Sequence, residues 1–211
     1  MTSALERTEL VVRTIAETTV ENETYFGALD SVVGDGDFGY SLARGFEKVL
    51  EQWDELDRTD SGVFLQKVAM LISSRMGGTS GPIWGTAFLR AAAVAKGRET
   101  LEAGDVVEML RAAIEGIKKR GGADLGEKTL LDALVPMTDT VEDLLGQGVA
   151  GREVLAGAAT TARSAAEATS ALQARRGRAS YTGERSIGSP DPGALAVAVL
   201  AEQIAARWPE H

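Results

Sequence analysis

The chain has 211 residues, a net charge of −9 at pH 7 and 44% hydrophobic residues, so we expect one globular domain over residues 1–211. It has no cysteine, which excludes disulfides, thiolate metal sites and cysteine nucleophiles, and its only histidine is His211. The acidic balance without a basic helix face argues against a nucleic-acid partner. There is no apolar run of about 18 residues and no leader pattern, so we expect a cytoplasmic protein without a membrane span.

The hydrophobic spacing predicts an all-α fold, because apolar side chains recur at helical intervals and no convincing series of strands appears. Eight helices are expected, at about residues 3–28, 40–56, 61–75, from Pro82 to 96, 104–120, 128–145, 152–172 and 192–208. Mostly short connections predict antiparallel neighbours in an up-and-down arrangement. The loops after the first, third, fifth and seventh helices should then lie at the same end.

The loop after the first expected helix carries three carboxylates, Asp30, Asp35 and Asp37. Their spacings of five and two residues do not fit one face of a helix, and interleaved glycines allow the backbone to turn sharply. Acids forced together in a turn repel one another unless a cation neutralises them. Oxygen ligands on a short loop suit a hard ion such as Mg²⁺ or Ca²⁺.

The same residues suggest three other interpretations of this loop. Its glycines match G-x-G-x-x-G, but a helix rather than a strand precedes them and the intervening acids would repel a phosphate. An EF-hand beginning at Asp35 would place Tyr40 and Phe46 where glycine and glutamate are required. A solvated Gly/Asp turn between two helices remains the alternative.

Three further loops carry chemistry suited to phosphate. Residues 77–82, Gly-Gly-Thr-Ser-Gly-Pro, lead into a helix and describe an anion site at its N-terminus. Residues 121–126 form a Gly-Gly loop, and residues 173–191 form a long loop with four arginines, the side chain best suited to phosphate. Plain connecting loops stay open as alternatives. Acids, amides and arginines gathered at one end describe a Mg-nucleotide site and phosphoryl transfer.

Four separated motifs, in order, resemble the ADP-binding L subunit of dihydroxyacetone kinases and the C-terminal domain of their single-chain relatives. They are Leu29-Asp30 to Gly39 with Gly45-Phe46, residues 77–82 with Gly85-Thr86, Lys128-Thr129 with residues 131–134, and residues 181–186 with 191–194. The resemblance covers nearly the whole chain. It implies an eight-helix antiparallel barrel with the nucleotide, ADP or ATP, at one end.

The resemblance also implies residue roles. Asp30, Asp35 and Asp37 would bind two Mg²⁺ ions, and together with Arg178 they are the expected catalytic set. The residues expected to contact the nucleotide are Phe38, Gly39, Tyr40, Ser41, Thr79, Ser80, Gly121, Leu130, Arg178, Asp191, Pro192 and Gly193. Within that set, Thr79 and Ser80 would hold phosphate, and Gly121 and Leu130 would border the adenine.

The partner implied is a K-type subunit that holds a short keto sugar, and the phosphoryl donor is either ATP or a phosphotransferase-system protein that rephosphorylates bound ADP. Phe38 departs from the family pattern, which usually has histidine there, and leaves the substrate and partner open. A subunit of a tetrulose (erythrulose-type) kinase, a non-catalytic nucleotide-binding docking module and a fatty-acid kinase domain are the alternatives. A homodimer is the oligomeric alternative.

Overall fold

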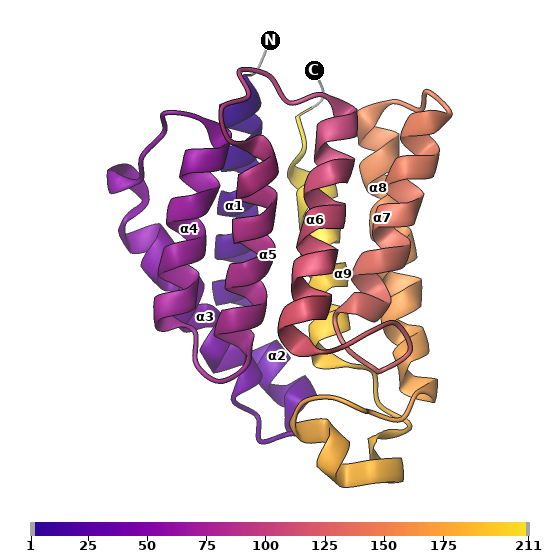
Figure 1. Ribbon diagram of the computed structural model, residues 1–211. Coiled ribbons are helices and arrows are strands. Elements are labelled where there is room, and N and C mark those ends of the chain that lie inside the picture. The colour runs from indigo at the N-terminus through magenta and orange to yellow at the C-terminus, as the bar shows by residue number, and fades with distance from the viewer. Residues whose placement is uncertain (1–2, 210–211) are drawn as a thin grey trace. The chain divides into compact units, whose positions relative to one another are not determined.

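The computed structural model describes residues 3–209, and within that range it contains helices and no strand (Figure 1). The predicted all-α fold is therefore confirmed, whereas the eight-helix barrel stays a prediction. His211, the single histidine of the sequence, lies outside the described residues. No helix between residues 3 and 209 is both long and apolar enough to cross a membrane.

Nine α-helices and three 3₁₀ segments follow one another between residues 3 and 209. They are α1 (Ala4–Glu21), α2 (Glu23–Asp30), α3 (Phe38–Glu51), η1 (Trp53–Glu55), α4 (Ser61–Arg75), α5 (Ser80–Ala95), α6 (Ala103–Gly121), α7 (Leu131–Gly146), α8 (Gly151–Ala168), η2 (Thr169–Ala171), η3 (Arg178–Ser186) and α9 (Pro192–Arg207). Most bounds agree with the predicted helices within a few residues.

Three expectations from periodicity are corrected. The first predicted helix is divided into α1 and α2 at Asn22, whose φ of −102° and ψ of 15° leave the helical region. The predicted sixth helix begins at Leu131 rather than Lys128, because Lys128 has a positive φ of 62° that a right-handed helix does not accept. The loop at residues 173–191 is not structureless, since η3 occupies half of it.

The described residues form two compact units, each assembled from two stretches of chain. The first contains residues 3–20 and 41–122. In it α5 packs between α4 and α6, and Phe46 lies edge-on to Trp84 and Phe88, with ring centroids 6.5 and 6.1 Å apart. Gly85 lies where α5 packs on α4, and an added Cβ there would lie 1.9 Å from Ser73 Oγ and 3.1 Å from Ser73 Cβ.

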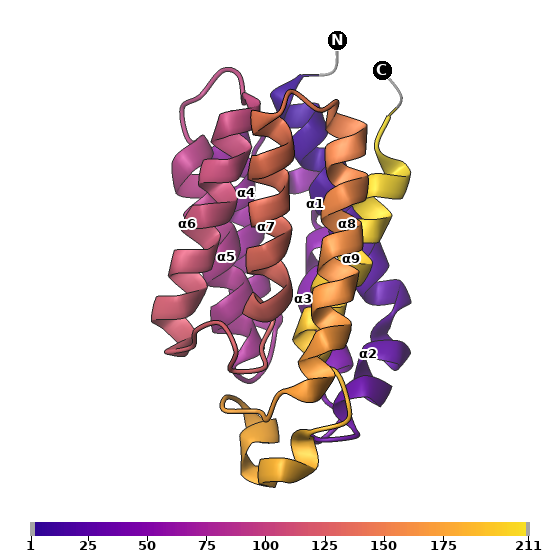
Figure 2. The same ribbon diagram turned by 90° about the vertical axis from the view of Figure 1, so that its right-hand side faces the viewer.

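The second unit contains residues 21–40 and 123–209. Its helix α8 packs against both α7 and α9 and runs antiparallel to them (Figure 2). The contact faces are rich in alanine, because small side chains allow helices to approach closely: Ala158, Ala159, Ala162 and Ala166 of α8 and Ala194, Ala196 and Ala198 of α9 are all buried. The start of α7, the end of α8 and the start of α9 therefore share one end of this unit, where the candidate site lies.

Candidate functional site

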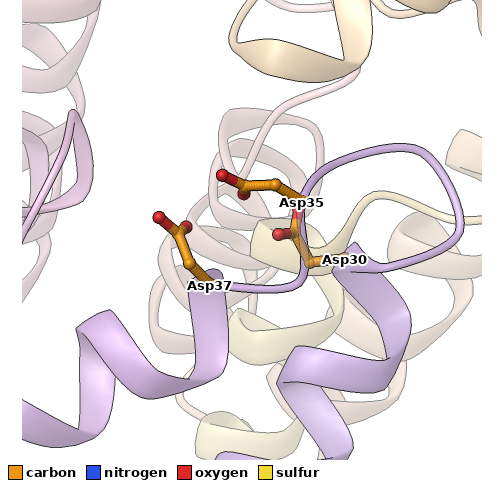
Figure 3. Close-up of side chains that lie close together, drawn as sticks. All are labelled: Asp30, Asp35 and Asp37. Carbon is orange, nitrogen blue, oxygen red and sulfur yellow. The ribbon is translucent and has the colours of Figure 1, made fainter.

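The three predicted carboxylates converge at the end of α2 and the loop that follows it (Figure 3). One carboxylate oxygen from each of Asp30, Asp35 and Asp37 lies within 4.8 Å of the other two. Asp30 is half-buried at the last position of α2, whereas Asp35 and Asp37 are exposed. Three acidic oxygens at this separation are a donor set that suits a hard divalent cation.

The acidic loop, residues 30–39, owes its shape to backbone contacts made over a few residues. The N–H of Gly34 donates to the carbonyl of Asp30 at 2.6 Å. The side chain of Asp30 then accepts from the N–H of Gly36 at 2.9 Å and of Phe38 at 3.4 Å. Asp30 thus organises the turn with one oxygen and presents its carboxylate to the other two acids.

Glycine is required where the acidic loop returns to α2. At Gly39 an added Cβ would lie 2.0 Å from the carbonyl oxygen of Glu23 and 2.5 Å from the amide nitrogen of Gly27. Gly36 adopts a φ of +77°, which glycine accepts without strain. These contacts hold Asp37 beside the end of α2 and so bring the three acids together.

The electrostatics of the loop favour a cation. Partial burial, followed by the neighbouring Asp30 carboxylate, raises the pKa of Asp37 above its ordinary value. A raised pKa means that the environment disfavours the charged form of the Asp37 carboxyl group. A positive charge close to its oxygens would lower the pKa again.

Arg178 is the predicted residue that the structure brings to the acids. Its guanidinium donates to Asp37 Oδ2 at 2.9 Å and forms a second ion pair with Asp35. All three side chains are about half exposed, with relative exposures of 53%, 50% and 50% for Arg178, Asp35 and Asp37. Solvent therefore screens these pairs, and they orient the side chains rather than stabilise the fold strongly.

Phe38 stands where the resemblance predicts histidine. Its ring lies 6.2 Å from the ring of the fully buried Phe26, tilted by 56°. The aromatic side chain is thus anchored on α2, and it offers no hydrogen-bond donor beside the acids.

A second group of predicted residues meets where α9 begins. Asp191 caps α9 by accepting from the N–H of Ala194 at 2.7 Å, and Pro192 occupies the first helical position. At Gly193 an added Cβ would lie 3.3 Å from Cβ of Leu130 and 3.0 Å from Asp191 Oδ2. Leu130 and the 191–193 turn are therefore neighbours, as a shared binding role requires.

The Asp191 carboxyl group is enclosed by protein although the residue as a whole retains some exposure. Burial raises its pKa to about 7, and the nearby Asp132 adds to the rise, whereas the Ala194 hydrogen bond and Lys128 oppose it. The protonation of Asp191 therefore changes near neutral pH.

Four of the residues predicted to contact the nucleotide belong to the first unit: Ser41, Thr79, Ser80 and Gly121. Ser41 is buried in α3, and a Cβ added at Gly77 would lie 3.4 Å from Ser41 Oγ. Thr79 precedes α5 but does not cap it with its side chain, and Ser80 is the first residue of α5. The structure thus brings Ser41 to the Gly-Thr-Ser loop, while Gly121 ends α6 in the same unit.

Sequence reasoning missed the role of Lys128, which was expected at the start of a helix. It lies instead in a turn, is only 2% exposed, and donates to three backbone carbonyl oxygens. Hydropathy patterns cannot reveal a buried lysine, and the Lys-Thr dipeptide was noted only as part of a motif.

Comparisons with known proteins agree with the resemblance. The DAK2 domain family matches residues 32–206. The ADP-binding subunit of the PEP-dependent dihydroxyacetone kinase of Escherichia coli is 39% identical over 86% of this chain and 86% of its own. The ADP-binding subunit of the PTS-dependent dihydroxyacetone kinase of Lactococcus lactis is 35% identical over 87% and 88%.

Solved structures give the same match. The dihydroxyacetone kinase of C. freundii in its native form has a TM-score of 0.75 and 27% identity over 95% of this chain. Its complex with AMP-PNP and Mg²⁺ has a TM-score of 0.73 over 97%. The chain spans about a third of each of those structures, 34% in both cases.

Proposed function

This chain belongs to the DAK2 domain family, and we propose that it is the nucleotide-binding subunit of a two-component dihydroxyacetone-type kinase. In this role it would transfer a phosphoryl group to a short keto sugar, such as dihydroxyacetone, held by a separate K-type subunit. The observation that carries the proposal is the convergence of three carboxylate oxygens within 4.8 Å beside Arg178. Positioning and charge neutralisation are the chief tasks of a protein in phosphoryl transfer.

Asp30, Asp35 and Asp37 would hold two Mg²⁺ ions, which would supply positive charge to the phosphate oxygens of the nucleotide. The donor set fits, since all three ligands are carboxylate oxygens that lie close together. With Mg²⁺ on the carboxylates, Arg178 would turn its guanidinium from these acids toward the phosphate, for which its planar fork is suited. It would thereby stabilise the charge on the transferred group.

The remaining predicted residues would bind the nucleotide. Thr79 and Ser80 would hold phosphate oxygens with a backbone amide and a hydroxyl at the start of α5. Other contacts would come from the residues that follow the acids, from the 191–193 turn and from the residues expected to border the adenine: Phe38, Gly39, Tyr40, Ser41, Gly121, Leu130, Asp191, Pro192 and Gly193.

The phosphoryl donor is either ATP or a phosphoprotein that rephosphorylates ADP in place. The names of the PEP-dependent and PTS-dependent relatives support the second. An erythrulose kinase subunit is the second candidate, because the L-erythrulose 1-kinase of Mycolicibacterium smegmatis is 35% identical over 90% of this chain, which covers 33% of that protein.

We also propose that residues 1–211 act as one nucleotide-binding domain in the cytoplasm, with a homodimer as the oligomeric alternative.

Mass spectrometry of nucleotide released from the purified protein, after dialysis with and without Mg²⁺, tests this function. Stoichiometric ADP that survives dialysis only with Mg²⁺ would support a tightly held ADP and a phosphoprotein donor. Exchangeable ATP would support direct transfer from ATP. Absence of nucleotide, together with no Mg²⁺-dependent binding of added ADP or ATP, would contradict the proposal and favour a plain Gly/Asp turn.

A further inference from the structure

A buried ammonium group lies where α7 begins. The Nζ atom of Lys128 donates to the carbonyl oxygens of Leu172 at 3.0 Å, of Ser189 at 2.6 Å and of Ser186. Lysine has three N–H donors and no acceptor, so these three carbonyls satisfy it completely. A charge that is 2% exposed is tolerated only when it is hydrogen-bonded in this way.

The three acceptors lie at both ends of one segment. Leu172 immediately precedes the arginine loop, residues 173–191, whereas Ser186 and Ser189 lie near its end. A single side chain therefore joins the two ends at the base of the loop. Arg178 lies between them, and its guanidinium is the group that reaches Asp35 and Asp37.

Other contacts at the base are individually weaker. The N–H of Ala174 donates to Ser186 Oγ at 2.9 Å, and the N–H of Gly188 donates to the carbonyl of Ser170 at 2.8 Å. Arg176 forms a two-pronged pair with Glu127 at 2.7 and 2.9 Å, but this pair is exposed to solvent. Hydrogen bonds to a charged group are about twice as strong as neutral ones, and solvent screens the exposed Arg176–Glu127 pair but not the buried Lys128 ammonium, which makes Lys128 the main link.

Lys128 is itself fixed by the turn in which it lies. The side chain of Asp132 accepts from the N–H of Gly126 at 2.5 Å and of Thr129 at 2.7 Å. This double cap spans Lys128 and supports its left-handed backbone, with φ at 62°. The ammonium group is thus aimed at the arginine loop by the local structure before α7.

We propose that Lys128 is a positioning residue that closes the base of the arginine loop and so holds Arg178 against the acidic residues. It touches neither the acids nor, on this proposal, the nucleotide, and it acts through Arg178. The part of the inference that concerns nucleotide affinity rests on the proposed function. The part that concerns the loop does not.

A double-mutant cycle separates positioning from general stability. Lys128→Met keeps the length of the side chain and removes all three donors, so we expect Mg-ADP, measured by isothermal titration calorimetry, to bind about tenfold more weakly. In the Arg178→Ala background the same change should cost less than about twofold, because the group that Lys128 positions is gone. Equal losses in both backgrounds would overturn the inference.

The matched control is Glu127→Gln, which removes the negative charge of an exposed ion pair with the same loop and should change the affinity by less than about twofold. Should Lys128→Met fail to fold, Lys128→Gln, which keeps an amide donor, replaces it in the same cycle.

Hydrogen exchange on the protein without nucleotide decides the loop part independently. Lys128→Met should lower the protection of the Ala174 and Gly188 amides while the interiors of α7, α8 and α9 keep theirs. If the Ala174 and Gly188 amides of Lys128→Met kept their protection, the inference would be overturned, whatever the affinity of this variant for Mg-ADP. Failure of the wild-type protein to bind Mg-ADP would count against the proposed function instead. The hydrogen-exchange result would still test whether Lys128 holds the base of the arginine loop.

Discussion

The acidic loop and the arginine loop meet at one ion-paired cluster, but they are held in different ways. The acidic loop is shaped by its own backbone, through amides donated to Asp30 and close approach of Gly39 to α2. The arginine loop depends on side chains far away in sequence, above all Lys128, which is 44 to 61 residues from its acceptors. One half of the site is therefore shaped by contacts between residues close in sequence, and the other half by tertiary contacts.

The largest expected effect comes from the acids themselves. Asp37→Ala should weaken Mg-ADP binding more than about 100-fold, because losing a metal ligand costs more than losing a group behind one. Asp37 is exposed, so the free energy of unfolding should change by less than about 0.5 kcal/mol. Calorimetry with ADP at fixed Mg²⁺ and urea unfolding measure both quantities.

Asp54→Ala, which removes an exposed aspartate of η1 in the other unit, is the control for the loss of one negative charge. Retained affinity in Asp37→Ala would rule out the metal assignment.

A backbone change should disrupt the acidic loop next most strongly. Gly39→Ala places a methyl group against the α2 backbone, where the atoms that it meets cannot move aside. We expect it to reduce the free energy of unfolding by about 2–3 kcal/mol and to weaken Mg-ADP binding. Thermal unfolding and calorimetry would show the two effects together.

Gly104→Ala, at a helical position with open space around it, should be neutral or slightly stabilising, by up to about 1 kcal/mol. A similar small effect at Gly39 would show that the acidic loop is not held by its approach to α2.

The Asp191 carboxyl gives the pH dependence. Since its pKa is raised to about 7 in the folded protein, the folded state binds the proton more tightly than the unfolded state does. The contribution to stability should therefore be greatest below the ordinary aspartate pKa, fall as pH rises toward 7, and stay constant above it. We expect a loss of about 2 kcal/mol, less than the whole shift gives, because the residue retains some exposure.

Asp191→Asn keeps the cap on α9 and removes the titration, so its stability curve should be flatter between pH 4 and 7. Urea unfolding at several pH values measures the difference. Parallel curves for the two proteins would assign the titration to other groups.

The smallest effect is expected at the tip of the arginine loop. Arg178→Ala removes exposed ion pairs and the proposed phosphate ligand, so Mg-ADP should bind about tenfold more weakly while the melting temperature changes by less than about 2 °C. Arg185→Ala, an exposed arginine of the same loop, is the control. If Arg178→Ala lowered the melting temperature by clearly more than about 2 °C and left the affinity for Mg-ADP nearly unchanged, the arginine loop would have a structural role instead.

The features that could be predicted from the sequence are those that depend on residues close together in the chain. Helical periodicity placed most helices, and the Asp and Gly spacing predicted a turn in which three carboxylates converge. The failures fall where distant contacts decide: Lys128 leaves the helix for a left-handed turn capped by Asp132, and η3 forms in a loop without periodicity. Membership of the family was likewise predictable, because four short motifs carry it, whereas the burial of one lysine was not.

The closure of the arginine loop at its base has a consequence for how this protein can vary. On the proposal that Lys128 joins the chain at both ends of the arginine loop, the length and sequence of residues 177–185, which lie beyond the contacts at the base, can change while α8 and α9 keep their packing. Exchange of that stretch between relatives is a direct way to transplant a loop tip, with its arginine, onto an unchanged helical scaffold.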